Sequence, residues 1–291
     1  SAPIFSSYIN RFSTGIPSPA YRFPDFLNRN GSDVNRYRLR EFTTVKQVNN
    51  SITGAVGVSG AAYIPEVDLM LTVDNNDTSF HVFDAARVSS TKLGEVDLSG
   101  FTDPEALEYL WTLYDSSAQP IGCVIAITEE QTNHIILSTW AFANVNGTIT
   151  KSASTIILPQ GMWTPDATEG MEGLTYNPFT NELYAAKQGG DMEFRVIPLD
   201  GTLNPQAYEP FDAEALWSSS FTQINDLTFD PNTRTVIGIA DELSASNANQ
   251  DIFRFNPQTG ALIEWWDNYV TDLGFNTTTW PQSEGIAITP D

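Results

Sequence analysis

The sequence predicts an all-β fold, and within that class a β-propeller, from three observations. A five-residue motif returns five times along the 291 residues, and Pro-containing turns precede several β-rich runs. No segment keeps a helical periodicity beyond about three turns. Repeats of roughly 40 to 50 residues, each with several short strands, are typical of propeller blades. Five copies of the motif predict five blades, and six blades are the alternative.

The motif begins with a polar residue and continues with mostly small and apolar residues. Its copies occupy residues 59–63 (SGAAY), 105–109 (EALEY), 172–176 (EGLTY), 225–229 (NDLTF) and 284–288 (EGIAI). Successive copies start 46, 67, 53 and 59 residues apart. A propeller brings the first strand of every blade to one central channel. We therefore expect the first residues of the copies to form one ring. The ring would be made by Ser59, Glu105, Glu172, Asn225 and Glu284.

Turns follow the motif copies and separate them from the next strands. Residues 176–181 (YNPFTN) and 229–234 (FDPNTR) each place Asn or Asp before Pro, and a related turn occupies residues 256–260. Proline fixes φ, and the preceding side chain can accept a hydrogen bond from a following backbone N–H, so these segments predict tight turns. The run after each turn alternates in polarity as a half-buried strand does. Residues 212–218 are expected to form one short helix.

These segments resemble the SdiA-regulated domain family, a group of bacterial five-bladed propellers that are usually exported from the cytoplasm. The similarity begins near Ser59 and runs to the C-terminus. Four pieces occur in the family's order and share the ring position. They are residues 58–63 with 69–75, 103–109 with 126–130, 172–176 with 186–187, and 282–287. The resemblance implies an exported propeller.

Two features depart from the family pattern. The fourth copy has Asn225-Asp226 where the family has Ser-Gly, and the sequence stops at Asp291, where family members continue through the remaining strands of the last blade. The N-terminal portion is the candidate to complete that blade, because residues 37–45 alternate in polarity as a strand does. We expect residues 37–45 to pair in the blade of Glu284, so that N- and C-terminal strands close the ring.

Charge divides the chain into two parts, which we expect to be an arm at residues 1–46 and a propeller domain at residues 47–291. The arm holds seven basic and three acidic residues, a net charge of +4, whereas the domain has a net charge of −26. The arm is also rich in Pro and aromatic residues, so we expect it to pack on the acidic domain. The acidic field makes nucleic acid and anionic membranes poor partners, and no apolar run is long enough to span a membrane.

The expected ring offers three carboxylates, an amide and a hydroxyl around one axis. Ca²⁺ prefers six to eight oxygen ligands from such groups. We expect a calcium-type cation held by Glu105, Glu172 and Glu284, with Asn225 and Ser59 as neutral ligands. The alternative is a sealed polar channel, in which the same side chains bind backbone N–H groups and water.

A second band of polar residues follows the inner strands by about one β-hairpin. We expect this band to line the channel mouth and to hold a ligand or a metal. It consists of Asp74, Glu129 or Glu130, Lys187, and Asp241 or Glu242. Asp226 is a further channel residue, next to the ring, whose side chain is expected to point the other way.

The composition narrows the enzymatic alternatives. Two histidines, His81 and His134, exclude a zinc site of three histidines, and no Gly-x-Ser-x-Gly motif occurs. His81 lies in a strand of alternating polarity and is expected to face solvent. Propeller phytases need a cluster of Lys and Arg around the phosphate, whereas the seven basic residues after position 46 are widely spaced. The sequence assigns no catalytic residue.

The sequence therefore favours a binding module over an enzyme. We expect a secreted, periplasmic or cell-surface propeller with a channel Ca²⁺ that binds an unidentified protein or small-molecule ligand. The alternative is a metal-dependent hydrolase of the phosphoesterase, phytase-like or lactonase type, in which a channel cation activates water. A cation enclosed by protein oxygens favours binding, and an open coordination position facing a pocket favours hydrolysis. The fold does not decide between them, because propellers host many functions.

Overall fold

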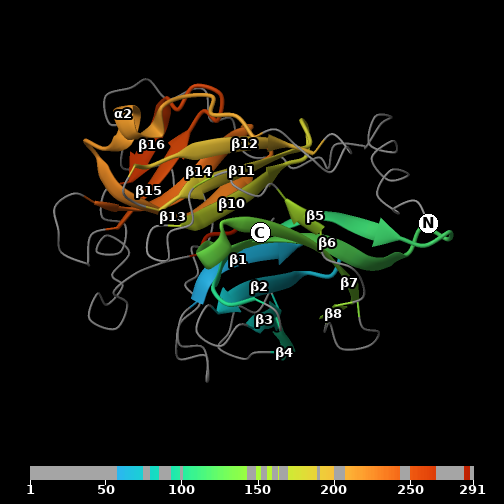
Figure 1. Cartoon of the computed structure of the whole chain (residues 1–291). Coiled ribbons are helices and arrows are strands. Elements are labelled where there is room, and N and C mark those ends of the chain that lie inside the picture. Colours follow the sequence, from blue (N-terminus) through green and yellow to red (C-terminus); the bar gives the residue numbers. More distant parts are fainter. Residues whose placement is uncertain are drawn as a thin grey trace.

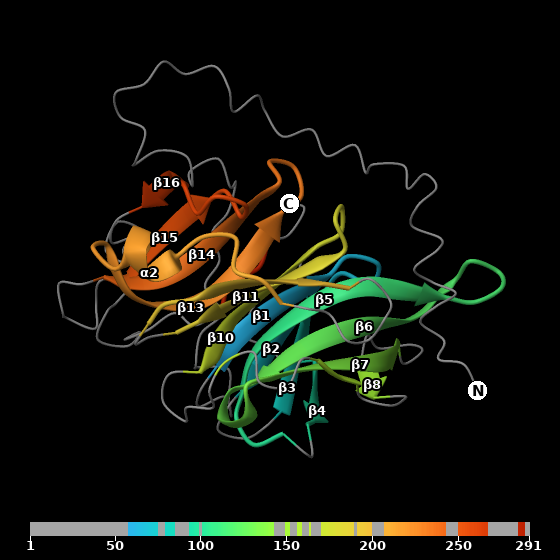
Figure 2. The same ribbon diagram turned by 45° about the horizontal axis from the view of Figure 1, so that its top comes forward.

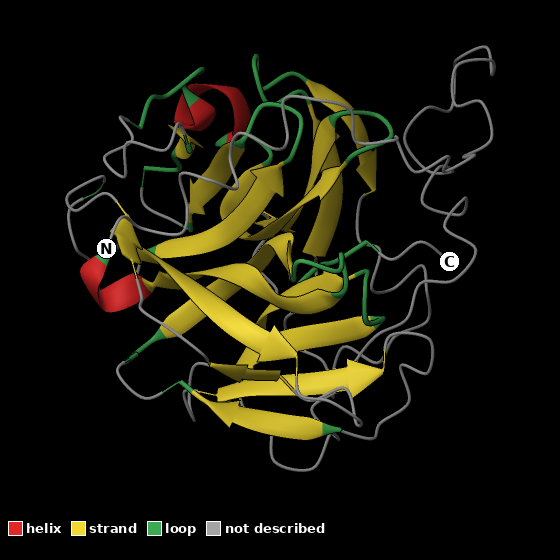
Figure 3. Cartoon of the chain, turned by 90° about the vertical axis from the view of Figure 1, so that its right-hand side faces the viewer, coloured by secondary structure: helices red, strands yellow, loops and turns green. Residues whose placement is uncertain are grey.

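The computed structural model has an all-β architecture (Figure 1). It describes residues 58–74, 79–84, 93–98, 101–142, 149–151, 156–158, 163, 170–188, 191–199, 207–242, 250–266 and 285–288. Strands dominate these residues, and the helical segments among them are two short turns (Figure 3). The all-β prediction is confirmed.

The strands form four antiparallel sheets. The first contains β1 (Val58–Ile64), β2 (Leu69–Asp74), β3 (Ser79–Asp84) and β4 (Gly94–Asp97). The second contains β5 (Pro104–Tyr114), β6 (Pro120–Glu129), β7 (His134–Phe142), β8 (Ile149–Lys151) and β9 (Ile156–Leu158). The third contains β10 (Met171–Asn177), β11 (Glu182–Lys187) and β12 (Phe194–Pro198), and the fourth contains β13 (Phe221–Asp230), β14 (Thr235–Glu242), β15 (Gln250–Phe255) and β16 (Leu262–Trp266). Apart from β9, which pairs with β7, each strand pairs with its neighbours in sequence, so each sheet is a meander.

The first strands of the four sheets lie next to one another at the centre of the molecule (Figure 1 and Figure 2). Each of these inner strands carries one copy of the motif, and β1 packs on β5, β5 on β10, and β10 on β13. Residues 285–288, from the last copy, lie against β1, since a Cβ on Gly285 would be 2.9 Å from the carbonyl carbon of Gly60. Meander sheets that radiate from inner strands around a centre define a β-propeller.

The inner strands approach closely because the second motif residue is small. It is Gly60 in β1, Ala106 in β5 and Gly173 in β10. A Cβ on Gly60 would lie 2.8 Å from the backbone Cα of Ala106, and a Cβ on Gly173 would lie 2.9 Å from Cγ of Leu227. A larger residue at these positions would push neighbouring inner strands apart.

The turns after the motif copies form as the sequence predicts. Asn177 Oδ1 accepts a hydrogen bond from the N–H of Phe179 at 2.9 Å, and Asp230 Oδ1 accepts one from Asn232 at 2.9 Å. Asn256 makes the same kind of bond in the third turn. These bonds close each turn locally and help to set the register of the hairpin that follows.

The helix α2 (Ala213–Trp217) confirms the short helix expected at residues 212–218. Asp212 caps it, because its Oδ1 accepts a hydrogen bond from a first-turn N–H at 2.8 Å. Trp217 is buried, and its indole N–H donates to the carbonyl oxygen of Gly260 at 3.0 Å, which docks the helix on the β15–β16 turn. Among the described residues, no helix has the length and apolar character to cross a membrane.

The hydrophobic core is divided among the interfaces between neighbouring sheets. One cluster joins β1, β2 and β3 to β5, β6 and β7, and a second joins β5, β6 and β7 to β10, β11 and β12. A third cluster, rich in aromatic rings, joins β11, β12 and α2 to β13, β14 and β15. Burial of apolar surface between sheets therefore stabilises the propeller, while the inner strands are free to carry polar residues.

His81 is not solvent-facing, so that prediction is wrong. It is fully buried in β3, and its Nε2 lies 3.1 Å from Ser79 Oγ. In the register, His81 lies between Thr72 of β2 and Glu95 of β4. Alternating polarity does not predict the burial of His81, because β3 lies inside a sheet and has buried residues on both of its faces.

Part of the expected architecture lies outside the described residues. This applies to the arm at residues 1–46, to the closing strand at residues 37–45 and to Glu284. The number of blades, the division of the chain at residue 46 and the closure of the ring stay predictions.

We expect Gly60→Ala to lower the free energy of unfolding by about 1–3 kcal/mol, the usual effect of overpacking. The added methyl group would meet the backbone of β5, which cannot rotate away as a side chain can. Denaturant unfolding followed by tryptophan fluorescence measures the change. Ser116→Ala, in the exposed β5–β6 turn, is the control, with an expected effect within about 0.5 kcal/mol. An unchanged unfolding midpoint for Gly60→Ala would contradict the close packing of β1 on β5.

Candidate functional site

Each of the four inner strands has a β-bulge at the first motif residue. The pairing register with the second strand of the sheet shifts across Ser59, across Glu105 and Ala106, across Glu172, and across Asn225. A bulged residue leaves the regular alternation of the strand, and bulges commonly re-aim a side chain next to a functional site. All four first residues are buried. The bulges therefore give a hydroxyl, two carboxylates and an amide equivalent positions on neighbouring inner strands.

Three carboxylates gather where the second sheet meets this ring. Asp103 precedes β5, Glu105 lies in β5, and Glu130 follows β6 in a 3₁₀ turn (Glu130–Thr132). One carboxylate oxygen from each residue lies within 4.8 Å of those of the other two. Glu105 and Glu130 are buried and Asp103 is half-buried. Carboxylates this close repel one another unless a proton or a cation neutralises them, and a set of oxygen ligands suits Ca²⁺.

Two backbone contacts fix Glu130. Its Oε1 accepts a hydrogen bond from the N–H of Gly170 at 2.9 Å, and its own N–H donates to the carbonyl oxygen of Asp103 at 3.0 Å. Gly170 immediately precedes β10 and lies two residues before the bulged Glu172. Glu130 therefore ties the acidic cluster to the start of the next inner strand.

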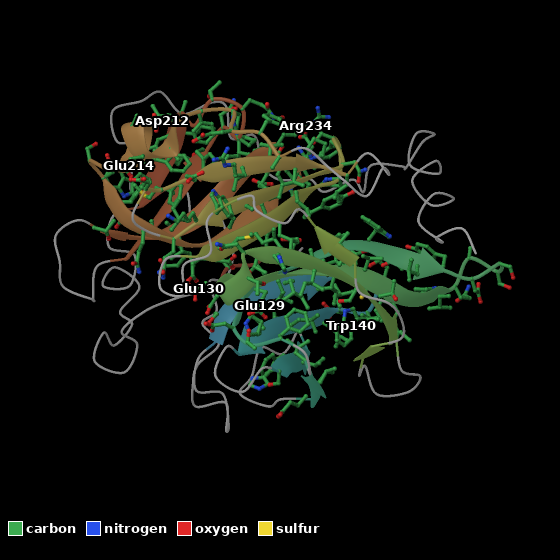
Figure 4. The ribbon with its side chains drawn as sticks, viewed as in Figure 1. Glu129, Glu130, Trp140, Asp212, Glu214 and Arg234 are labelled. Carbon is green, nitrogen blue, oxygen red and sulfur yellow. The ribbon has the colours of Figure 1, made fainter. Side chains whose placement is uncertain are left out.

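Glu129 holds a loop in place. Its carboxylate accepts hydrogen bonds from the N–H of Thr102 at 2.8 Å, the hydroxyl of Thr102 at 2.6 Å and the N–H of Asp103 at 2.9 Å. Glu129 and Glu130 are neighbours in the chain (Figure 4), yet Glu129 stabilises the segment that carries Asp103 while Glu130 joins the cluster itself. The sequence offers Glu129 and Glu130 as alternatives for one position. In the structure their side chains make different contacts.

The other residues of the second band end the second strands of their sheets. Asp74, Lys187, Asp241 and Glu242 each pair with an inner-strand residue that precedes the bulge. The backbone of the band thus lies beside the ring. Lys187 is half-buried. The side chains of Asp74, Asp241 and Glu242 lie outside the described part of the structure.

Asp226 lies in the middle of the inner strands and is fully buried. Its carboxylate accepts hydrogen bonds from the N–H of Leu227 at 2.8 Å and from the N–H of Ile286 at 2.9 Å. The backbone N–H groups of Leu174 and Ala61 also bond to it. These four donors are the third residues of four motif copies. One carboxylate therefore connects β1, β10, β13 and the last copy of the motif.

The remaining inner strand, β5, contributes a second carboxyl group to this centre. Burial raises the pKa of Glu108 well above its ordinary value, interaction with the side chain of Thr175 lowers it, and the negative charge of Asp226 raises it further. Burial also raises the pKa of Asp226, and its backbone N–H donors oppose that rise. Glu108 is not among the site residues expected from the sequence, although it stands at the fourth motif position, where the other copies have Ala or Thr.

A protein-family model described as SdiA-regulated matches residues 36–289. This match covers most of the chain, and the chain therefore belongs to the SdiA-regulated family. The resemblance inferred from the motifs is confirmed. Among curated proteins, no match to this chain is found.

Several solved structures are similar to this one. Regucalcin from Agrobacterium tumefaciens, a calcium-binding protein, has 11% sequence identity and a TM-score of 0.44, covering 82% of this chain and 81% of its own. A chain of a nidogen/laminin complex has 12% identity and a TM-score of 0.45, covering 79% and 84%. A putative 6-phosphogluconolactonase from Bacteroides fragilis has 14% identity and a TM-score of 0.38, covering 70% and 52%.

Glu129→Ala should lower the free energy of unfolding by about 1–3 kcal/mol, because it leaves the N–H groups of Thr102 and Asp103 without their acceptor. Urea unfolding with and without a chelator measures the effect. The matched control is Asp191→Ala, an exposed acidic residue, for which we expect a change within about 0.5 kcal/mol. Equal stabilities for the two variants would show that Glu129 does not hold the loop.

Proposed function

We propose that this chain is a binding module that holds a calcium-type cation at the bulged positions of its inner strands. The observation that carries the proposal is the bulge itself, which places a buried oxygen-bearing side chain at the same motif position in β1, β5, β10 and β13. A bulge interrupts strand pairing, so its recurrence at one position is expected where a side chain must be aimed.

Glu105 is the centre of the proposed site. It combines a ring position with membership of the acidic cluster, where Asp103 and Glu130 bring oxygens within 4.8 Å. Ser59 Oγ is buried and makes no hydrogen bond to the described residues, so its oxygen is available to a ligand or to water. The proposed donors are Asp103, Glu105, Glu130, Glu172, Asn225, Ser59 and Glu284.

Electrostatics supports a cation at this position. Two carboxylate charges 4.8 Å apart repel by roughly 3.5 kcal/mol at an effective dielectric constant of about 20. A divalent cation converts that repulsion into attraction and satisfies several oxygens together. The sealed polar channel is the competing arrangement, and backbone N–H groups already satisfy Glu129 and Asp226 in that way. Whether the stability of the protein depends on calcium distinguishes the cation site from the sealed polar channel.

We also propose that the propeller works outside the cytoplasm and binds a protein or a small molecule. The exported character of the SdiA-regulated family and the strongly acidic domain support this location. Extracellular calcium modules bind with dissociation constants of about 10⁻⁴–10⁻³ M, so the site need not be tight.

Calcium should raise the melting temperature of the wild-type protein, because the cation binds the folded state and not the unfolded chain. Glu172→Gln should reduce calcium affinity at least tenfold, which corresponds to about 1.4 kcal/mol. The variant should therefore melt lower than wild type in calcium and close to wild type in chelator. Scanning calorimetry in the two buffers measures both effects, with Asp191→Asn as the exposed control. If calcium leaves the wild-type melting temperature unmoved, the proposed site is wrong.

The second candidate function is a metal-dependent hydrolase. Lys187 is a basic residue whose backbone pairs at the start of β10, beside the proposed site, and a positive group there favours an anionic substrate. A phosphate needs several such groups, so we expect no strong activity on phosphomonoesters. Release of phosphate from phytate, with and without calcium, tests this. Calcium-dependent turnover at ordinary rates, about 1–10³ s⁻¹, would replace the binding-module proposal with the hydrolase.

A further inference from the structure

The acidic cluster lies at one end of a chain of hydrogen bonds, the rim chain, that crosses three sheets. The N–H of Glu130 donates to the carbonyl oxygen of Asp103 at 3.0 Å, and Glu130 Oε1 accepts the N–H of Gly170 at 2.9 Å. The carbonyl oxygen of Gly170 accepts the N–H of Gln188 at 2.9 Å, and that of Gln188 accepts the N–H of Ile224 at 3.0 Å. The rim chain therefore leads from the second sheet, past the ends of β10 and β11, to β13 of the fourth.

One link in the rim chain is a side chain, and the other links join backbone atoms. That side chain belongs to Glu130 (Figure 4), which is also a member of the acidic cluster with Asp103 and Glu105. Its carboxylate therefore has two kinds of neighbour, the N–H of Gly170 and the oxygens of the cluster. A movement of this carboxylate changes both the cluster and the link between the second and third sheets.

Gly170 makes the room for the side chain of Glu130. A Cβ on Gly170 would lie 2.1 Å from Cγ of Glu130 and 3.1 Å from both its Cδ and its Oε1. The Glu130 side chain therefore occupies the place where any other residue would have a side chain of its own. A contact of this length is far below van der Waals distance, so one of the two groups would have to move. The flexible Glu130 side chain is the one that moves, because the rim chain holds the backbone of Gly170 to Gln188.

We propose that Gly170 is a positioning residue for the proposed cation site and that it acts through Glu130. This inference rests on the proposed function. Gly170 leaves space for the Glu130 side chain and donates the N–H that holds its carboxylate beside Asp103 and Glu105. A cation bound in the cluster removes the repulsion that pushes the same carboxylate away, so the cation and Gly170 favour one position of Glu130.

Gly170→Ala tests the positioning role in chelator, where no cation contributes. The added methyl group displaces the Glu130 side chain, so the unfolding equilibrium constant should rise about tenfold or more. Glu130→Ala has no Cγ to meet the methyl group, and in this background the same substitution should raise the constant by about twofold or less. Any effect of alanine on the unfolded chain is the same in both backgrounds and cancels.

Denaturant unfolding of the wild type, the two single variants and the double variant measures this cycle. Equal effects of Gly170→Ala in the two backgrounds would overturn the proposal. If Gly170→Ala does not fold, the double variant with Glu130→Ala should fold and should unfold as Glu130→Ala does, because the clash is gone. A double variant that also fails to fold would overturn the proposal as well.

Glu130→Gln separates the contact with Gly170 from the charge of the carboxylate. The glutamine Oε1 still accepts the N–H of Gly170, and its NH₂ group donates to the carboxylates of Asp103 and Glu105. In chelator this variant should therefore be at least as stable as wild type, whereas Glu130→Ala should be less stable. A glutamine variant as unstable as the alanine variant would show that the link to Gly170 does not hold Glu130, and would overturn the proposal.

Calcium affinity, measured by titration calorimetry, connects the positioning role to the cation site. Gly170→Ala and Glu130→Ala should each lower the affinity about tenfold or more, and the double variant should bind no more weakly than Glu130→Ala. Asp191→Asn, the exposed control, should bind as wild type does. Losses that multiply in the double variant would overturn the proposal. A wild type that binds no calcium would overturn the proposed function, and the unfolding cycle in chelator would still decide whether Gly170 positions Glu130.

Discussion

The architecture depends on how closely the inner strands can approach. Gly60 and Gly285 lie where an added Cβ would be 2.8–2.9 Å from a neighbouring backbone atom, and Gly173 lies where it would be 2.9 Å from the Cγ of Leu227. This spacing brings the N–H groups of the third motif residues within reach of one carboxylate, Asp226. The fourth copy is the one with a larger side chain at the second motif position, and this residue is Asp226. Its side chain occupies the space beside the small residues of the other copies.

The same spacing separates two kinds of polar site. At the centre, backbone donors satisfy the carboxylate of Asp226 without a metal. One residue earlier in each copy, the bulges present oxygen-bearing side chains such as Glu105 and Glu172, and the acidic cluster adds Glu130. The chemistry of an oxygen-rich site with several negative charges suits a cation, which is the basis of the proposed function. The apolar clusters between the sheets supply the stability that allows this concentration of charge.

The sequence predicted the features that are local or periodic. The motif spacing predicted the propeller, Asn or Asp before Pro predicted the turns, and the shared first position predicted residues that the structure finds on equivalent bulges. Contacts between segments could not be predicted in this way. Asp103 looks like a loop residue until Glu129 fixes its backbone beside Glu105, and Glu108 becomes significant only beside Asp226. The expectation for His81 failed because alternation along one strand cannot show whether its polar face is buried in the folded protein.

The most direct test of the cation site is an anomalous-scattering map from crystals grown in calcium. We expect a peak about 2.3–2.6 Å from carboxylate oxygens of Glu105 and of at least one of Asp103, Glu130 and Glu172. Density for an ion there would establish that the bulged positions of the inner strands form a metal centre. A map with no anomalous peak among these carboxylates at saturating calcium would rule out the proposed cation site and favour the sealed polar channel.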